Sequence, residues 1–167
     1  MAFDRNAIAI GRRIQDFGLC DLKGAYQHST RLRGKGFLVV AFVNPLESNS
    51  VAVVKRLQDW LALSDKVGVV VLTVGERDDA AKMIESTGVT YPVLWDFEAY
   101  TAMTWAVTAA PTIFIVNGQG LVLGRVLGND KDELEAAKTM LLEEVRKLEE
   151  AAKAAADAAA AAAAAKK

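Results

Sequence analysis

Two continuous apolar runs separated by an amphipathic segment constrain the fold of this chain more than any other feature. The first run is Phe37–Val43 and the second lies within residues 66–74. Between them, apolar residues recur at the spacing of one helix face, at Val51, Val54, Leu57, Trp60 and Leu61. Strands that consist of unbroken apolar residues are typical of parallel sheets buried on both faces. The sequence therefore predicts a β–α–β unit and an α/β fold.

The alternation continues downstream with more helices, a β hairpin and a long terminal helix. Residues 77–87 form a helical pattern that ends at Gly88, and residues 97–107 form a short apolar one. This part of the chain is also rich in aromatic residues. We expect four of them to pack in the core rather than to stack on a ligand: Tyr91, Trp95, Tyr100 and Trp105.

Five short motifs follow one another along the chain. Their sequences are QDFGLCDLKG at 15–24, RLRGKG at 31–36, YPVLWD at 91–96, AAPTIFIV at 109–116 and NGQG at 117–120. Together they resemble the motifs of the thioredoxin-like redoxins, in the branch of the membrane-anchored thiol-disulfide reductases and the alkyl hydroperoxide reductase relatives. Gln15 stands where that family carries proline. The resemblance implies a thioredoxin-like fold, with a central mixed β-sheet flanked by helices, an N-terminal hairpin and a cis proline at Pro111.

The loop at residues 44–50 (NPLESNS) contains no cysteine, although the family carries its reactive CxxC motif there. The resemblance places Glu47 at the first cysteine position and Ser50 at the second, with Ser48 and Asn49 between them. Neither a carboxylate nor a hydroxyl can form the disulfide intermediate of thiol exchange. The loop still suits a helix start, because the helix dipole favours Glu47 and because Ser48 or Ser50 could act as the N-cap.

The main functional prediction is therefore a redox-inactive thioredoxin-like domain with no catalytic residue. It would serve as a protein-binding or assembly subunit of a larger complex, through the surface around Glu47 and Pro111. The alternative is a thiol-disulfide oxidoreductase or a peroxiredoxin-like antioxidant enzyme with an atypical active site.

Cys20 is the single cysteine, so the chain cannot form an internal disulfide. Its place in an alternating stretch predicts a small, half-buried strand residue. The sharper alternative is a one-cysteine redox or attachment site, because a lone thiol can form a mixed disulfide with a partner. No Lys, Arg or His lies within two residues of it. The single histidine, His28, is expected on the surface of the N-terminal hairpin, with nothing nearby that suggests a catalytic triad.

Several classes of function find no support in the sequence. One cysteine and one histidine argue against a metal site, and no glycine-rich phosphate loop occurs, so we expect no metal or cofactor. A net charge of −1 predicts no nucleic-acid partner, and no apolar run is long enough for a membrane span. Residues 1–13 lack a secretory signal, which predicts a soluble cytoplasmic protein if Met1 is native. A periplasmic or organellar location would follow if a leader had been removed.

The C-terminal segment carries a helical pattern without Gly or Pro from residue 129 to the end, about 37 residues and roughly 55 Å long. We therefore divide the chain into a thioredoxin-like core with an N-terminal extension at 1–128 and a terminal helix with an alanine-rich extension at 129–167. The apolar stripe of this helix changes from Leu and Val to Ala alone after Leu148. The extension could be a frayed tail, a surface that docks on a partner or sister subunit, or an alanine run that does not represent the native side chains. The residues expected to contact a partner are Leu148, Ala152, Ala155 and Ala159.

Overall fold

A five-stranded mixed β-sheet forms the centre of the computed structural model, which describes residues 7–166. Its strand order is β5-β4-β3-β6-β7. The strands are β3 (Phe37–Val43), β4 (Val67–Thr73), β5 (Val93–Trp95), β6 (Thr112–Val116) and β7 (Val122–Leu127). β3, β4 and β5 are parallel, whereas β6 and β7 join through antiparallel pairing. The two apolar runs of the sequence are the adjacent strands β3 and β4, as predicted.

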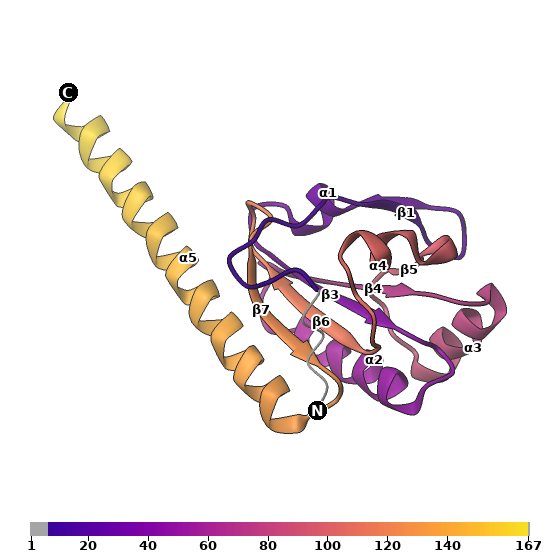
Figure 1. Cartoon of the computed structure of the whole chain (residues 1–167). Coiled ribbons are helices and arrows are strands. Elements are labelled where there is room, and N and C mark those ends of the chain that lie inside the picture. The colour runs from indigo at the N-terminus through magenta and orange to yellow at the C-terminus, as the bar shows by residue number, and fades with distance from the viewer. Residues whose placement is uncertain (1–6, 167) are drawn as a thin grey trace.

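Helices and a small hairpin cover both faces of the sheet (Figure 1). The hairpin consists of β1 (Gly18–Cys20) and β2 (Tyr26–His28), and the short helix α1 (Ser29–Arg33) follows it. The remaining helices are α2 (Ser48–Leu61), α3 (Arg77–Thr87), the 3₁₀ turn η1 (Phe97–Ala99), α4 (Tyr100–Thr104) and α5 (Lys131–Ala165). This arrangement agrees with the mixed sheet, flanking helices and N-terminal hairpin that the motifs imply.

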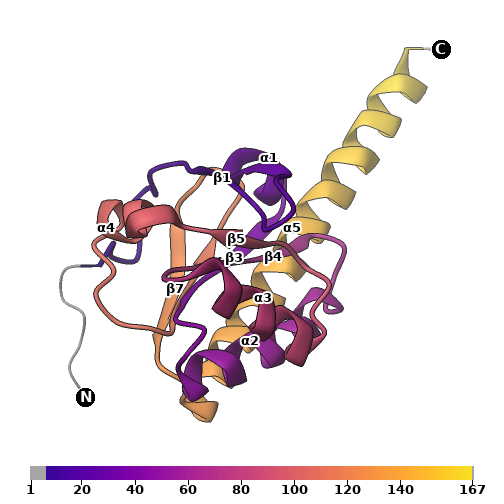
Figure 2. The same cartoon turned by 90° about the vertical axis from the view of Figure 1, so that its right-hand side faces the viewer.

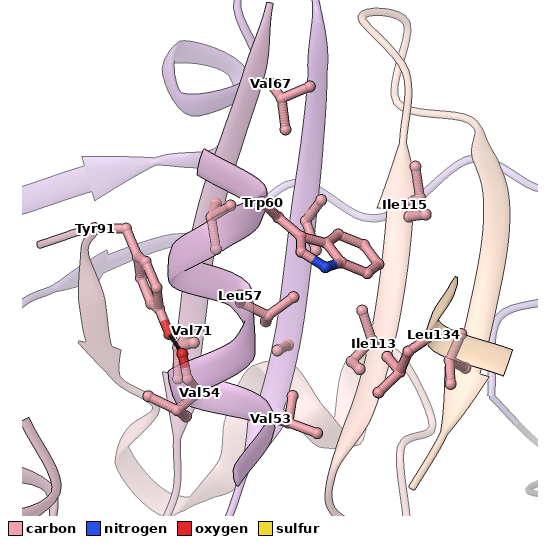
Figure 3. Close-up of a cluster of buried hydrophobic side chains, with 14 of the residues drawn as sticks. Val53, Val54, Leu57, Trp60, Val67, Val71, Tyr91, Ile113, Ile115 and Leu134 are labelled. Carbon is pink, nitrogen blue, oxygen red and sulfur yellow. Dashed lines mark hydrogen bonds between the residues drawn. The ribbon is translucent and has the colours of Figure 1, made fainter. Parts of the chain in front are cut away.

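Alternate residues of β3 point to two separate cores, one on each face of the sheet. Val39 and Ala41 belong to the core under α2, α3 and the first half of α5. Figure 3 shows this core, in which Leu57 and Trp60 of α2 face the strands. The Tyr91 hydroxyl donates to the Val54 carbonyl oxygen there. Burial raises the pKa of Tyr91 far above its ordinary value, so this phenol stays protonated.

The opposite core is built around Trp105, which is fully buried. Its ring makes edge contacts with Phe17, Phe42 and Phe114 at centroid distances of 5.9, 5.2 and 5.1 Å. The indole Nε1 donates to the Gln15 carbonyl oxygen at 3.0 Å. This core ties the N-terminal segment and α4 to the sheet. The second view of the molecule shows α4 and the hairpin on the opposite side of the sheet from α2 and α3 (Figure 2).

The prediction that four aromatic residues pack in the core is wrong for Tyr100. Tyr91 and Trp105 are buried and Trp95 is half-buried, but Tyr100 is 66% exposed. The single helix predicted over 97–107 is broken into η1 and α4, and Glu98 has a φ of 55°. The buried carboxylate of Asp96 accepts two backbone N–H groups of α4, each at 2.9 Å. These bonds fix the helix with Thr101 and Ala102 inward, so Tyr100 turns outward.

Helix α5 is 35 residues long and continues well past the body of the domain (Figures 1 and 2). Asp130 caps it by accepting the Glu133 N–H at 2.9 Å. Leu134, Leu141 and Val145 are buried against the sheet, as the stripe predicted. Residues 149–166 are exposed. None of the helices between residues 7 and 166 combines the length and the hydrophobicity that a bilayer span requires.

Candidate functional site

The loop between β3 and α2 keeps the shape of a helix start without a sulfur atom. Glu47 is the N-cap of α2, with extended backbone angles (φ −102°, ψ 127°), and its side chain makes no capping hydrogen bond. Ser50 is fully buried, and its Oγ accepts the Asn44 N–H at 3.1 Å. The prediction that Ser48 or Ser50 caps the helix is therefore wrong, because the hydroxyl of Ser50 holds the end of β3 instead.

A pocket of about 280 Å³ lies beside this loop. We call it the Glu47 pocket. Its wall combines the ends of β3 and β4, part of η1 and α4, and the segment before the cis Ala110–Pro111 bond. The lining residues are Phe42, Val43, Asn44, Glu47, Val74, Ala99, Ala102, Val107, Thr108, Ala109 and Ala110. The cis proline that the resemblance implied is thus confirmed, and the fold brings Glu47 next to the residues that precede it. Ser48 and Asn49 are exposed and do not line this pocket.

Cys20 lies on the outward face of the N-terminal hairpin, and the prediction of a half-buried residue is wrong. It is exposed because Leu19, the neighbouring strand residue, takes the inward position and packs against the core of Trp105. In the antiparallel register Cys20 is opposite Tyr26, and Gly18 is opposite His28. Residues directly opposite each other share a face, as do residues two apart on one strand. These four residues therefore form one surface, which we call the Cys20 face.

Gly18 influences how accessible the Cys20 sulfur is, because it leaves room for the Tyr26 side chain. A Cβ atom at this position would lie only 1.8 Å from the Tyr26 hydroxyl oxygen. The tyrosine ring therefore leans over Gly18 and toward His28, with ring centroids 6.5 Å apart. Its hydroxyl end consequently lies over Gly18 rather than over the residue opposite it, Cys20.

Hydrogen bonds at the turn of the hairpin hold one end of the Cys20 face in place. At the turn, the Asp21 carboxylate accepts the N–H groups of Lys23 and Ala25, each at 2.9 Å. In the same turn, the guanidinium of Arg77 donates to the Leu22 carbonyl oxygen. The sequence did predict a hairpin here, but nothing in it indicated these anchoring contacts.

The base of the hairpin is held by a charged cluster around Asp16. Its carboxylate accepts from the Arg33 guanidinium at 2.5 Å and from the Ser29 hydroxyl at 2.8 Å. Burial alone would raise the pKa of Asp16, but these hydrogen bonds and the positive charge of Arg33 outweigh it, so the pKa is lowered. Asp16 is thus held as a carboxylate.

His28 ends β2, as expected of a hairpin histidine. Its Nδ1 lies 2.7 Å from the Thr30 hydroxyl oxygen and accepts the Thr30 N–H at 3.3 Å, which caps α1. Since Nδ1 accepts a backbone proton, the neutral ring carries its own proton on Nε2. Within residues 7–166 no three His, Cys, Asp or Glu side chains are grouped to hold a metal ion.

The structure keeps the predicted positions in three separate places. Glu47 and the segment before Pro111 meet in the Glu47 pocket, whose lining does not include Cys20. On α5, Leu148 is half-buried at the edge of the domain, while Ala152, Ala155 and Ala159 are exposed. That these four residues contact a partner stays a prediction.

Comparison with known proteins gives sequence relatives and structural neighbours, although no protein-family model matches the chain. The thiol-disulfide oxidoreductase ResA of Geobacillus thermodenitrificans is 26% identical over 146 residues, which are 81% of this chain and 82% of ResA. The thiol:disulfide interchange protein DsbE of Xylella fastidiosa is 44% identical over 63 residues, 36% of this chain and 32% of DsbE. A putative protein disulfide isomerase from Bacteroides thetaiotaomicron superposes with a TM-score of 0.75 at 16% identity, over 83% of this chain and 91% of that one.

These comparisons confirm the fold and correct the predicted function. The structural likeness establishes the thioredoxin-like architecture. The sequence relatives are named for thiol–disulfide chemistry, so the redox-inactive assembly subunit is the wrong main prediction. The comparisons favour the alternative, a thiol-disulfide oxidoreductase with an atypical active site. An exposed thiol is present at Cys20, outside the cysteine-free loop.

Proposed function

Because the chain has a thioredoxin-like fold and is similar in sequence to thiol-disulfide oxidoreductases, we propose that it catalyses thiol–disulfide exchange through a single cysteine, Cys20. The observation that supports this most directly is the exposure of Cys20 on a hairpin that is anchored at its turn and at its base. Exchange needs a thiolate that reaches a disulfide, and Cys20 is the one thiol in the sequence.

The proposed reaction takes two displacement steps. The Cys20 thiolate attacks one sulfur of a substrate disulfide, so that a bond from Sγ to that sulfur forms as the substrate S–S bond breaks. The other substrate sulfur leaves as a thiolate and takes a proton from water. An external low-molecular-weight thiol, as its thiolate, then attacks the substrate sulfur of the mixed disulfide. That step releases the Cys20 thiolate and a new disulfide between the substrate and the external thiol.

The residues around Cys20 have definite parts in this scheme. Tyr26, 63% exposed, offers an aromatic surface on the same face as Cys20, on which the chain around a substrate disulfide can pack. The absence of a second cysteine makes the external thiol obligatory, because no intramolecular disulfide can form. A compartment that supplies such a thiol suits this scheme. The cytoplasm, where glutathione keeps thiols reduced, is such a compartment.

The test is the turnover of a mixed disulfide between a short peptide and glutathione, with excess glutathione as the external thiol. The wild-type chain should raise the rate above that of glutathione alone, and Cys20→Ser should remove this increase. Ser48→Ala, at an exposed position of the cysteine-free loop, should leave it unchanged. Without external thiol, mass spectrometry should find the Cys20 adduct accumulating. An increase over glutathione alone that survives Cys20→Ser, or no increase with the wild type, would remove this proposal.

A further inference from the structure

The Glu47 pocket combines an apolar wall with a single carboxylate, and neither has a part in thiol–disulfide exchange at Cys20. Apolar groups dominate its wall, among them the side chains of Phe42, Val74, Ala99 and Val107. At about 280 Å³ it falls just below the range of about 300–1,000 Å³ typical of pockets for drug-sized ligands. Its size therefore suits a single side chain or a small molecule of similar size.

Glu47 is the one charged residue of this lining, as far as residues 7–166 define it. Its side chain is half-buried, and within the same range its carboxylate has neither an ion pair nor a hydrogen bond. Among the described residues, no Lys, Arg or His lines the pocket. A carboxylate that is partly removed from water without a partner gains free energy when a cation binds beside it.

A second acceptor belongs to Asn44, which also lines the pocket and precedes Glu47 by three residues. The Asn44 Oδ1 accepts the Leu46 N–H at 3.0 Å, and a carbonyl oxygen has a further lone pair. An ammonium group has three donors and no acceptor, so it matches a carboxylate and an amide oxygen together. An anion would meet repulsion from Glu47, and a purely apolar ligand would leave the carboxylate unpaired.

We propose that the Glu47 pocket binds an alkyl ammonium group, with the aliphatic stem against the apolar wall and the ammonium beside Glu47. Two sources supply this group, a lysine side chain of a polypeptide and a small free amine. Binding here involves no covalent step and no sulfur, so it does not depend on exchange at Cys20.

The experiment measures binding to the full chain by isothermal titration and by backbone amide NMR. The probes are the blocked pentapeptide Ala-Ala-Lys-Ala-Ala, the same peptide with norleucine in place of lysine, and n-butylammonium. Glu47→Gln removes the charge with little change of shape. Glu76→Gln is the matched control, because Glu76 is also a helix N-cap without a capping hydrogen bond but does not line the pocket.

The lysine peptide should shift the amides of Ala99, Val107 and Ala110, and Glu47→Gln should weaken its binding about fivefold, as expected of a half-exposed ion pair. Glu76→Gln should leave the affinity unchanged. The norleucine peptide should bind wild type and Glu47→Gln with the same low affinity. Tighter binding of the lysine peptide than of n-butylammonium identifies a polypeptide as the source, and equal binding identifies a small amine.

Two results would overturn the proposal: equal affinity of the wild type for the lysine and norleucine peptides, or equal affinity of wild type and Glu47→Gln for the lysine peptide. Should Glu47→Gln unfold, salt provides the second measurement on the wild type. Added salt should weaken the binding of the lysine peptide and of n-butylammonium but not the binding of the norleucine peptide. The same salt dependence for all three probes would count against the ion pair.

Discussion

Adjacent leucines on α5 allow a sharp test of what holds this helix to the domain. Leu141 is fully buried against the sheet, whereas Leu142 is 39% exposed on the neighbouring side of the same turn. Leu141→Ala removes buried methyl groups and leaves a cavity, which costs about 2–5 kcal/mol of the free energy of unfolding. Leu142→Ala vacates surface that water already reaches, and should cost about 1 kcal/mol or less.

In a chain of this size each kcal/mol lowers the melting temperature by about 2–4 °C, so a loss of about 3 kcal/mol at Leu141 corresponds to about 6–12 °C. Urea unfolding followed by tryptophan fluorescence measures both variants, and an unchanged slope would show that the unfolded states are comparable. Alanine has the higher helix propensity at both positions, so propensity cannot produce the difference. Equal losses at the two sites would refute the packing of α5 described above.

Three further predictions concern the extension, the hairpin and its charged base. Removal of residues 151–167 should leave the urea midpoint unchanged at low protein concentration, and a lower midpoint would show that the extension contributes to the stability of the single domain. Gly18→Val should force the ring of Tyr26 away from position 18 and toward Cys20. The reaction of the Cys20 thiol with a disulfide reagent should then slow severalfold, and an unchanged rate would contradict the arrangement of the Cys20 face. Asp16 has a pKa below its ordinary value of 3.8, so its stabilising effect is present above that pH and is lost as the pH falls through the folded-state pKa. The difference in unfolding free energy between wild type and Asp16→Asn should therefore shrink below about pH 4, and a constant difference down to pH 2 would argue against the ion pair with Arg33.

The central sheet could be predicted from the sequence because its strands are marked by unbroken apolar runs. β3 and β4 each carry seven residues with almost no polar side chain, and in a chain without membrane-length runs that pattern is typical of parallel strands buried on both faces. The apolar stripe of α5 could also be predicted from the sequence. Only alanine continues the stripe after Leu148, and this is the point where the helix leaves the domain.

The functional positions were less predictable, because they depend on contacts between distant segments. The hydroxyl of Ser50 was expected to serve its own helix, but it bonds Asn44, six residues earlier. Cys20 was expected to be half-buried from its residue type and its place in an alternating stretch, but in the structure Leu19 takes the inward position. Tyr100 was expected in the core from its aromatic ring, and the bonds from Asp96 rotate it outward.

The outer half of α5 has no tertiary contact to start it, and an isolated helix of that length is marginal in water even when it is rich in alanine. The costly step in helix formation is the first turn, and here the packed turns around Leu134, Leu141 and Val145 already provide it. Residues 149–165 only have to propagate from that nucleus. The helical structure of the extension therefore depends on the folded domain. Amide hydrogen exchange along the extension should become faster toward Ala165, and unfolding of the sheet should unfold the extension as well.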